Sequence, residues 1–124
     1  MALSQFRSRR KASGGRYKRT RSHPISEHGS EPMFTRIDKR RVKTVKGPGS
    51  TSKRKALSLN EITVMIDGKT VKTEMSSVLE NPANRNYVRR NIITRGTIVD
   101  TPKGKVRVTN RPSQEGHAQG VLLG

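Results

Sequence analysis

The sequence has no cysteine and no tryptophan, and its 124 residues include only two tyrosines and two phenylalanines. Without cysteine it can form neither disulfides nor a thiolate zinc site. The longest apolar run is the short stretch around residues 62–66, and the N-terminus MALSQFR lacks the apolar region of a signal peptide. So few apolar residues do not suit an amphipathic membrane-binding helix. These absences predict an intracellular protein with no metal, no cofactor and no membrane contact.

Acidic residues are also scarce, because 9 Asp and Glu stand against 27 Lys and Arg. The formal net charge is +18 and the pI is about 11.6, which is typical of a nucleic-acid binder. Residues 1–60 carry 17 basic and 3 acidic residues, net +14, whereas residues 61–124 carry 10 and 6, net +4. Apolar residues are concentrated in the second half. We therefore expect the first half to bind the partner and the second half to supply the core.

The stretch SQFRSRRKASGGRYKRTR, residues 4–21, contains eight cations and no acid. Low hydrophobicity with high charge predicts that the first 30 residues order only on an anionic partner. The glycines Gly14 and Gly15 would let the backbone approach RNA closely or turn through positive φ. A solvated tail is the alternative. The cations expected to neutralise phosphates are Arg7, Arg9, Arg10, Lys11, Arg16, Lys18, Arg19 and Arg21.

Alternating apolar residues at 62, 64 and 66, followed by Asp67-Gly68, predict a β-hairpin that returns through residues 71–73. A second hairpin is predicted from residues 97–99 and 105–109, with cations on its outer side. Leu57 and Leu59 occupy odd positions whereas Ile62 and Val64 occupy even ones. The inward face should therefore change near residues 60–61 through a bulge or bend. Residues 121–123 should form a last strand that closes the sheet.

Asn81 followed by Pro82 predicts a short helix that ends near residue 90. On it Ala83 and Tyr87 would share one face, so that Tyr87 packs in the core rather than on a base. Residues 46–55 read as a loop rich in Gly, Ser and Lys. Together these features predict a mainly β fold: a small antiparallel β-barrel with one short helix and a long, extended basic N-terminal tail. The tail would cover residues 1–33, and the barrel would cover 34–124 with a basic loop at 46–55.

Further cations of the predicted barrel are candidates for RNA contact. For those near residues 40–55 a solvated strand face or loop is the alternative, and two arginines in the last turn of a helix also suit its dipole. These cations are Arg40, Arg41, Lys43, Lys53, Arg54, Lys55, Arg85, Arg89, Arg90, Arg95, Arg107 and Arg111. Four aromatic residues are too few for a base-stacking platform, so recognition should depend on RNA backbone and shape. The three histidines show no metal-ligand spacing.

Three motifs carry a resemblance to a known family: RSRRKASGGR (residues 7–16), ENPANRNYVRRNIITRGTIVDT (80–101) and GKVRVTNRP (104–112). They resemble the archaeal and eukaryotic small-subunit ribosomal protein S8e family over nearly the whole chain. The resemblance implies a β-barrel with a basic N-terminal extension, embedded in small-subunit ribosomal RNA among neighbouring ribosomal proteins in the cytoplasm, and no catalysis. The chain has Ser13 and Glu27-His28-Gly29 where the family usually has Thr and an acidic-apolar-Gly step. Its short length favours an archaeal type.

The residues also suggest two classes of function other than a ribosomal one. A general nucleic-acid-binding or chromatin-like protein fits the charge equally well, but it predicts indifference between duplex DNA and structured RNA. An enzyme would need paired carboxylates or a cofactor loop, whereas the acids of the second half are scattered near predicted strand ends and turns. We therefore expect no catalysis and no small-molecule substrate.

Overall fold

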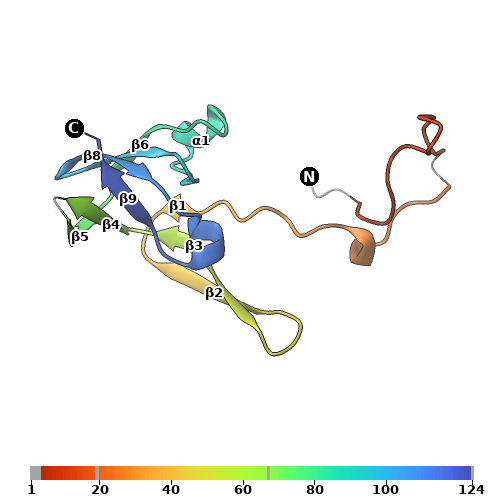
Figure 1. Cartoon of the computed structure of the whole chain (residues 1–124), viewed down its shortest axis with the longest axis horizontal. Coiled ribbons are helices and arrows are strands. Elements are labelled where there is room, and N and C mark those ends of the chain that lie inside the picture. Colours follow the sequence, from red (N-terminus) through yellow and green to blue (C-terminus); the bar gives the residue numbers. More distant parts are fainter. Residues whose placement is uncertain (1–3, 19, 67, 124) are drawn as a thin grey trace. The chain divides into compact units, whose positions relative to one another are not determined.

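The computed structural model describes residues 4–18, 20–66 and 68–123, so Arg19 and Asp67 lie outside the described residues. The chain divides into two compact units, residues 1–32 and residues 33–124, which are described separately. In the first unit the chain turns back on itself: Ser4 pairs with His28, and the Gln5 amide donates to the Glu27 carbonyl at 2.8 Å. Among its described residues, Ile25–Glu27 form the 3-10 turn η1. Figure 1 shows the course of both units.

The second unit begins with a three-stranded sheet of order β1-β3-β2. Its strands are β1 (Arg36–Ile37), β2 (Arg41–Lys46) and β3 (Ser52–Leu59). β2 and β3 form an antiparallel hairpin, whereas β1 lies parallel to β3. The prediction of a loop at residues 46–55 is therefore corrected: β2 ends at Lys46 and β3 begins at Ser52, so that only residues 47–51 form the loop. The polar composition of this stretch favours a loop, but cross-strand pairing places both of its ends in strands.

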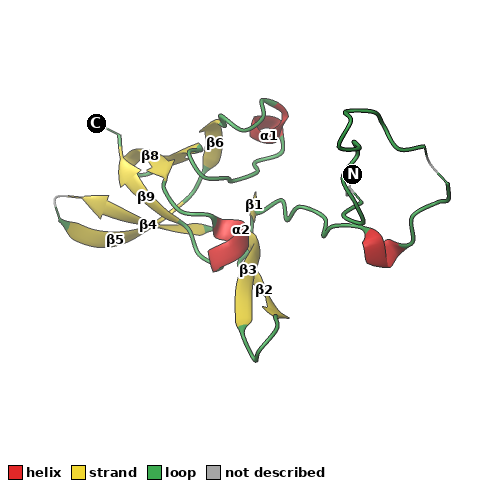
Figure 2. Ribbon diagram, turned by 45° about the vertical axis from the view of Figure 1, so that its right-hand side comes forward, coloured by secondary structure: helices red, strands yellow, loops and turns green. Residues whose placement is uncertain are grey.

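The other sheet has six strands in the order β5-β4-β9-β8-β7-β6. Both predicted hairpins are confirmed: β4 (Glu61–Ile66) pairs with β5 (Lys69–Glu74), and β7 (Ile98–Thr101) pairs with β8 (Gly104–Val108). β6 (Ser77–Glu80) forms one edge. The strand expected at 121–123 is β9 (Gln119–Leu122), which joins the hairpins by pairing parallel to β4 and antiparallel to β8. Figure 2 shows β9 between them.

The mainly β prediction is confirmed, but the barrel is not closed. Edge strands β5 and β6 do not pair with each other, and β1–β3 and β4–β9 are parallel pairs in an otherwise antiparallel arrangement. The buried cluster nevertheless takes side chains from both sheets, including Ala56 of β3, Val64 of β4 and Val106 of β8. Burial of each of the two valines contributes about 1.5–3 kcal/mol. Shared packing therefore holds the two open sheets together.

The exposure of Leu57 corrects the prediction that the inward face of the chain changes near residues 60–61. Leu57 is 37% exposed, whereas Ala56 and Ser58 are buried. The reason is a bulge opposite β2, because Arg41 pairs with Ser58 but Val42 pairs with Ala56, so that Leu57 has no partner. The irregularity thus lies three residues before the predicted site, and the break at residue 60 separates the two sheets instead.

The described part of the chain has two short α-helices where the sequence predicted one. α1 covers Asn86–Arg89 and starts later than expected. Asn81 is buried and donates to the Ile92 carbonyl at 3.0 Å, while its Oδ1 accepts from the Ala83 amide. Side-chain bonds of this kind hold the backbone in a turn and compete with helix formation. The Asn84 Oδ1 accepts from the Asn86 amide at 2.9 Å, so helix initiation is displaced to that turn.

The second helix, α2, covers Pro112–Glu115 and packs against β3. Pro112 stands at the helix start, the Glu115 carboxylate accepts from the Arg111 amide at 3.2 Å, and Gly116 ends the helix with φ 78°. These are ordinary start and stop signals, and they make this helix recognisable in the sequence although only the helix near residues 81–90 was predicted. None of the helices in the described ranges is long and apolar enough to cross a bilayer.

Candidate nucleic-acid interface

The basic stretch of the first unit is built around a tight turn. The Lys11 amide donates to the Gly15 carbonyl at 2.8 Å, the Gly14 amide donates back to the Lys11 carbonyl, and Arg10 pairs with Arg16 across the turn. Gly14 has φ 83°, which favours glycine. The Arg10 Nη1 donates to the Gly14 carbonyl at 3.1 Å. The local sequence therefore forms a loop that presents cations from both arms.

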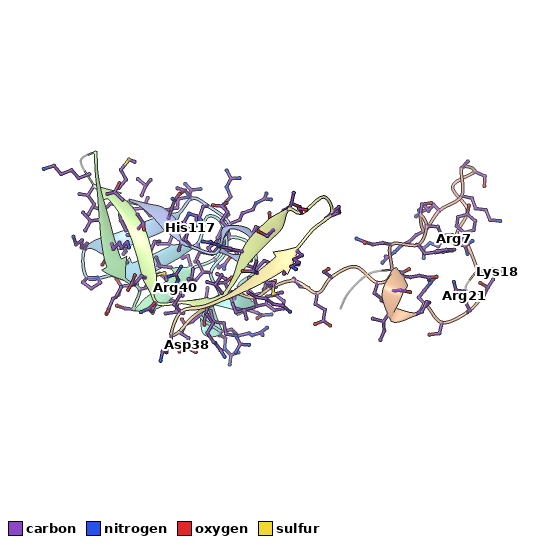
Figure 3. The ribbon with its side chains drawn as sticks, turned by 90° about the horizontal axis from the view of Figure 1, so that it is seen from below. Arg7, Lys18, Arg21, Asp38, Arg40 and His117 are labelled. Atoms are coloured by element: carbon purple, nitrogen blue, oxygen red, sulfur yellow. The ribbon has the colours of Figure 1, made fainter. Side chains whose placement is uncertain are left out.

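Aromatic side chains hold several of these cations in place. The Arg7 guanidinium lies 4.1 Å from the Tyr17 ring centre, and the Lys11 ammonium lies 5.8 Å from it. Arg21 approaches the Phe6 ring at 5.7 Å. Exposed cation–π contacts contribute about 0.5–1 kcal/mol each, so they bias the side chains without removing their charge from solvent. Figure 3 marks Arg7, Lys18 and Arg21 in this unit.

Glu27 is the acidic counterpart within the first unit. The Arg21 Nη2 contacts its Oε1 at 2.5 Å and the His23 Nδ1 contacts its Oε2 at 2.8 Å. The His23 hydrogen bond, with that of Arg21, holds the pKa of the Glu27 carboxyl below its usual range. Arg21 therefore already has an anionic partner within the chain, and its predicted contact with an RNA phosphate stays a prediction.

The β2–β3 hairpin is the second basic surface. No acidic residue occurs between Lys39 and Asn60. Lys43 lies directly opposite Lys55, and Val45 opposite Lys53. Alternation along the strands places these three lysines on one face and Arg54 on the other, toward Gly116 of the α2 end. Like charges directly opposite each other are unfavourable without an anion. We call Lys43, Lys53 and Lys55 the ribbon lysines.

Arg40 and Arg41 lie at the base of this hairpin, and Figure 3 marks Arg40. The Arg41 Nε donates to the Ser58 hydroxyl at 3.4 Å. Lys39 precedes the hairpin and Lys46 is the last residue of β2; both are exposed, and neither was among the candidates predicted from the sequence. The absence of any acid across residues 39–60 was the signal that could have identified them.

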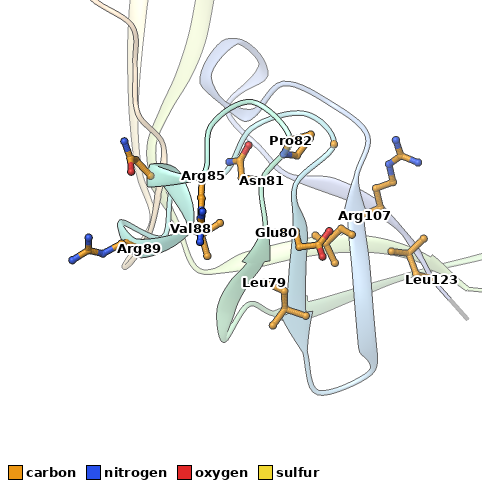
Figure 4. A pocket seen from close by; sticks show the side chains of 12 residues that line it. Leu79, Glu80, Asn81, Pro82, Arg85, Val88, Arg89, Arg107 and Leu123 are labelled. Atoms are coloured by element: carbon orange, nitrogen blue, oxygen red, sulfur yellow. The ribbon is translucent and has the colours of Figure 1, made fainter.

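Arg85, Arg89 and Arg107 line one groove of about 1050 Å³. Arg85 and Arg89 come from the region of α1 at one side, whereas Arg107 comes from β8 at the other (Figure 4). The aliphatic side chains of Val88 and Leu123 also line the groove. All three arginines were predicted to contact RNA, but their position around a shared groove was not predictable from the sequence.

Arg90, Arg95 and Arg111 remain apart from these sites. Arg90 lies 5.3 Å from the Phe34 ring centre, and Phe34 makes an edge contact with Tyr87 at 5.7 Å. Tyr87 is half-buried against Phe34 and lies outside the buried core cluster, and its predicted partner Ala83 is exposed, so the prediction of core packing holds only in part. Arg95 is exposed in a turn, and the Arg111 amide caps α2.

Each histidine is engaged by a neighbouring oxygen. His28 Nδ1 lies 2.8 Å from the Pro24 carbonyl, and His117 Nδ1 lies 3.1 Å from the Glu115 carbonyl. Within the ranges that the structure describes, no group of three or more His, Cys, Asp or Glu side chains is arranged to hold a metal ion. The chemistry available at the basic surfaces is therefore charge neutralisation and hydrogen bonding by Lys and Arg.

Comparison with known proteins agrees with the motifs. Residues 4–123 match the family model of ribosomal protein S8e. The small ribosomal subunit protein eS8 of Methanobrevibacter smithii is 42% identical over 99% of this chain and 100% of its own length. The proteins of the same name from Haloquadratum walsbyi and Methanocella arvoryzae are each 43% identical over 96% of this chain, and over 95% and 97% of their own lengths. The chain therefore belongs to the ribosomal protein S8e family.

Proposed function

We propose that the chain is a structural constituent of the small ribosomal subunit in the cytoplasm, and that it binds small-subunit ribosomal RNA. The contacts would come from the basic turn of residues 7–21, Arg19 included by sequence, and from the β2–β3 hairpin. Arg90, Arg95 and Arg111 would add phosphate contacts from the rest of the second unit. The role requires no catalysis and no cofactor, and it places neighbouring ribosomal proteins beside the chain.

The ribbon lysines are the observation that carries this proposal. Lys43 and Lys55 face each other directly, and no carboxylate of the described residues lies within 4.0 Å of any of the three ammonium groups. Such an arrangement is destabilising in the free chain and becomes favourable when phosphates lie against it. Names of the relatives place them in the small ribosomal subunit, which supports ribosomal RNA as the polyanion.

Footprinting of small-subunit RNA by the full chain tests the proposal. We expect a limited set of RNA helices to be protected at elevated salt, where duplex DNA of equal length does not compete. The triple variant Lys43→Gln/Lys53→Gln/Lys55→Gln should lose a contiguous part of the footprint. The matched variant Lys69→Gln/Lys72→Gln/Lys103→Gln loses the same charge elsewhere and should keep it.

The alternative is a general nucleic-acid-binding protein. It predicts equal competition by duplex DNA and RNA, and a uniform loss of protection in both triple variants, because only total charge would matter. Either result would contradict the proposed ribosomal RNA role.

A further inference from the structure

The outer face of the six-stranded sheet carries one continuous row of paired residues. Each member is the direct cross-strand partner of the next, so all point to the same face. Taken from β5 to β6, the members of this outer row are Thr70, Met65, Val121, Arg107, Ile98 and Glu80.

Met65 and Val121 form an apolar pair in the outer row that the second unit does not cover. Met65 is 57% exposed and Val121 is 48% exposed, although they pair directly. Leu79 of β6 and Leu123, just after β9, are 39% and 37% exposed. Contiguous exposed aliphatic side chains mark interaction surfaces. Only 29% of the residues are hydrophobic, so each exposed aliphatic side chain is one fewer for a small core. Binding of RNA phosphates does not explain why these side chains are exposed.

The outer row leads into the groove with the arginines. Arg107, Ile98 and Glu80 belong both to the row and to the groove lining. Arg85 and Arg89 stand at the other side of the groove (Figure 4). Over the described residues, no carboxylate lies within 4.0 Å of these three guanidinium groups. An apolar stripe thus ends in a site with an excess of positive charge.

We infer that this face is a protein-docking surface that takes an extended segment of a neighbouring small-subunit protein. The segment would place aliphatic side chains over Met65 and Val121, and an Asp or Glu carboxylate between Arg89 and Arg107. Interface cores are depleted of charge except for arginine and are enriched in methionine, which matches this combination. The charge distribution supports the same division, since residues 61–124 carry +4 against +14 for residues 1–60. The inference rests on the proposed ribosomal role.

Site-specific photo-crosslinking in assembled small subunits tests it. Photo-methionine at Met65 and photo-leucine at Val121 keep nearly the native size. Photo-leucine at Val45, which lies opposite Lys53 on the face of the ribbon lysines, is the internal reference. We expect positions 65 and 121 to crosslink to an apolar protein segment that contains an Asp or Glu, and position 45 to crosslink to RNA. Crosslinks of 65 and 121 to RNA, to a second copy of the chain, or to water alone would overturn the inference.

Charge neutralisation supplies the second measurement. Arg89→Gln/Arg107→Gln should lower the yield of the protein crosslink at Val121 by at least about tenfold, because the partner carboxylate loses its counter-charge. The affinity of Arg89→Gln/Arg107→Gln for an isolated ribosomal RNA fragment should equal that of Lys69→Gln/Lys103→Gln, which loses the same charge outside the outer row and the groove. An unchanged yield of the protein crosslink would show that the partner's carboxylate does not bind in the groove. RNA crosslinks at position 45 with none to protein at 121 would refute the docking surface alone, whereas no RNA crosslink at 45 would refute the proposed function.

Discussion

Adjacent glycines in the basic turn differ in what they require. Gly14 has φ 83°, so Gly14→Ala should cost the turn about 1–2 kcal/mol through backbone strain. A Cβ on Gly15 would meet only the Ser13 Oγ at 3.7 Å, so Gly15→Ala should leave the free turn intact. If RNA lies against the Gly15 backbone, Gly15→Ala should still weaken binding without changing its salt dependence.

Binding isotherms at several salt concentrations, with the turn followed by NMR chemical shifts, would separate the two effects. Wild-type affinity for Gly15→Ala would show that RNA does not approach the backbone there. Gly14→Ala serves as the matched control, because it should alter both the shifts and the affinity.

Gly120 of β9 is the glycine on which the core depends most. A Cβ there would lie 2.4 Å from Val106 Cγ1 and 2.8 Å from the Arg107 carbonyl oxygen. Because the second neighbour is backbone, the strands must move apart to accept a methyl group. We expect Gly120→Ala to lower the free energy of unfolding by about 1–3 kcal/mol or more, measured by urea denaturation. The neighbouring exposed substitution Gln119→Ala should change it by less than about 0.5 kcal/mol, and equal effects would argue against the clash.

The sequence shows which residues are charged, but it does not show which charged side chains pair with each other in the folded chain. Eight cations without an acid in residues 4–21 indicated an anionic partner, yet Glu27 lay just outside that stretch and engages Arg21. The requirement at Gly120 could not be predicted either, because it arises only when β9 pairs with both β4 and β8.

At the scale of elements, the β2–β3 hairpin should respond in opposite senses in the free and bound states. Replacing Lys43 and Lys55 by Gln removes a cross-strand repulsion, so Lys43→Gln/Lys55→Gln should raise the stability of the free chain by about 0.2–1 kcal/mol. The same variant should bind ribosomal RNA more weakly. Thermal melts and binding at one salt concentration test both signs, and a loss of stability would contradict the repulsion.

The α2 start should depend on pH through Glu115. The Asn110 side chain, followed by the Arg111 amide, donates to this carboxylate and lowers its pKa from the ordinary 4.5. A group with a lowered pKa contributes stability above its unfolded pKa, and the contribution is lost as the pH falls through the folded pKa. At pH 6, Glu115→Gln should therefore have a lower melting temperature than the wild type. The decrease in the free energy of unfolding should be less than about 1 kcal/mol, because the site is exposed.

Thermal melts across the acid range provide the measurement. The gap between wild type and Glu115→Gln should close as the pH falls below 4.5. A gap of constant size across this range would assign the effect to lost packing or bonding instead of charge.

The hairpins that combine alternation with turn residues were predicted well, whereas β2 and β3, which depend on cross-strand pairing, were not. The two hairpins of the six-stranded sheet combine alternation with turn residues in a short stretch. β2 and β3 alternate weakly and consist largely of polar residues, so composition favoured a loop. The late start of α1 depends on Asn81 reaching the Ile92 carbonyl, a contact that only the folded chain provides.

For the whole molecule, the first unit should set the salt dependence of binding. If six of its eight cations neutralise phosphates, removing residues 1–32 should make the slope of log K against log salt shallower by about four to five units. The second unit should stay folded, because the buried hydrophobic residues all lie between 56 and 118. Binding titrations and circular dichroism would measure both, and an unchanged slope would show that the first unit does not lie on phosphates.

The outer row was not predictable from the sequence, although each of its members was visible there. Met65, Arg107 and Val121 are far apart along the chain, and only the insertion of β9 between the hairpins brings them into one line. The family motifs, by contrast, are continuous in sequence and gave the identity of the chain without any knowledge of its topology.

The central position of β9 also orders events during synthesis. The first hairpin of the six-stranded sheet is complete by residue 74 and the second by residue 108, but they do not pair with each other. Residues 119–122 must leave the translating ribosome before the sheet can form across its middle. Until then, Val64 and Val108, each paired with Gly120 in the finished sheet, face open strand edges. The nascent chain therefore has an interval in which it is prone to aggregate or be degraded, and release of the final strand ends it.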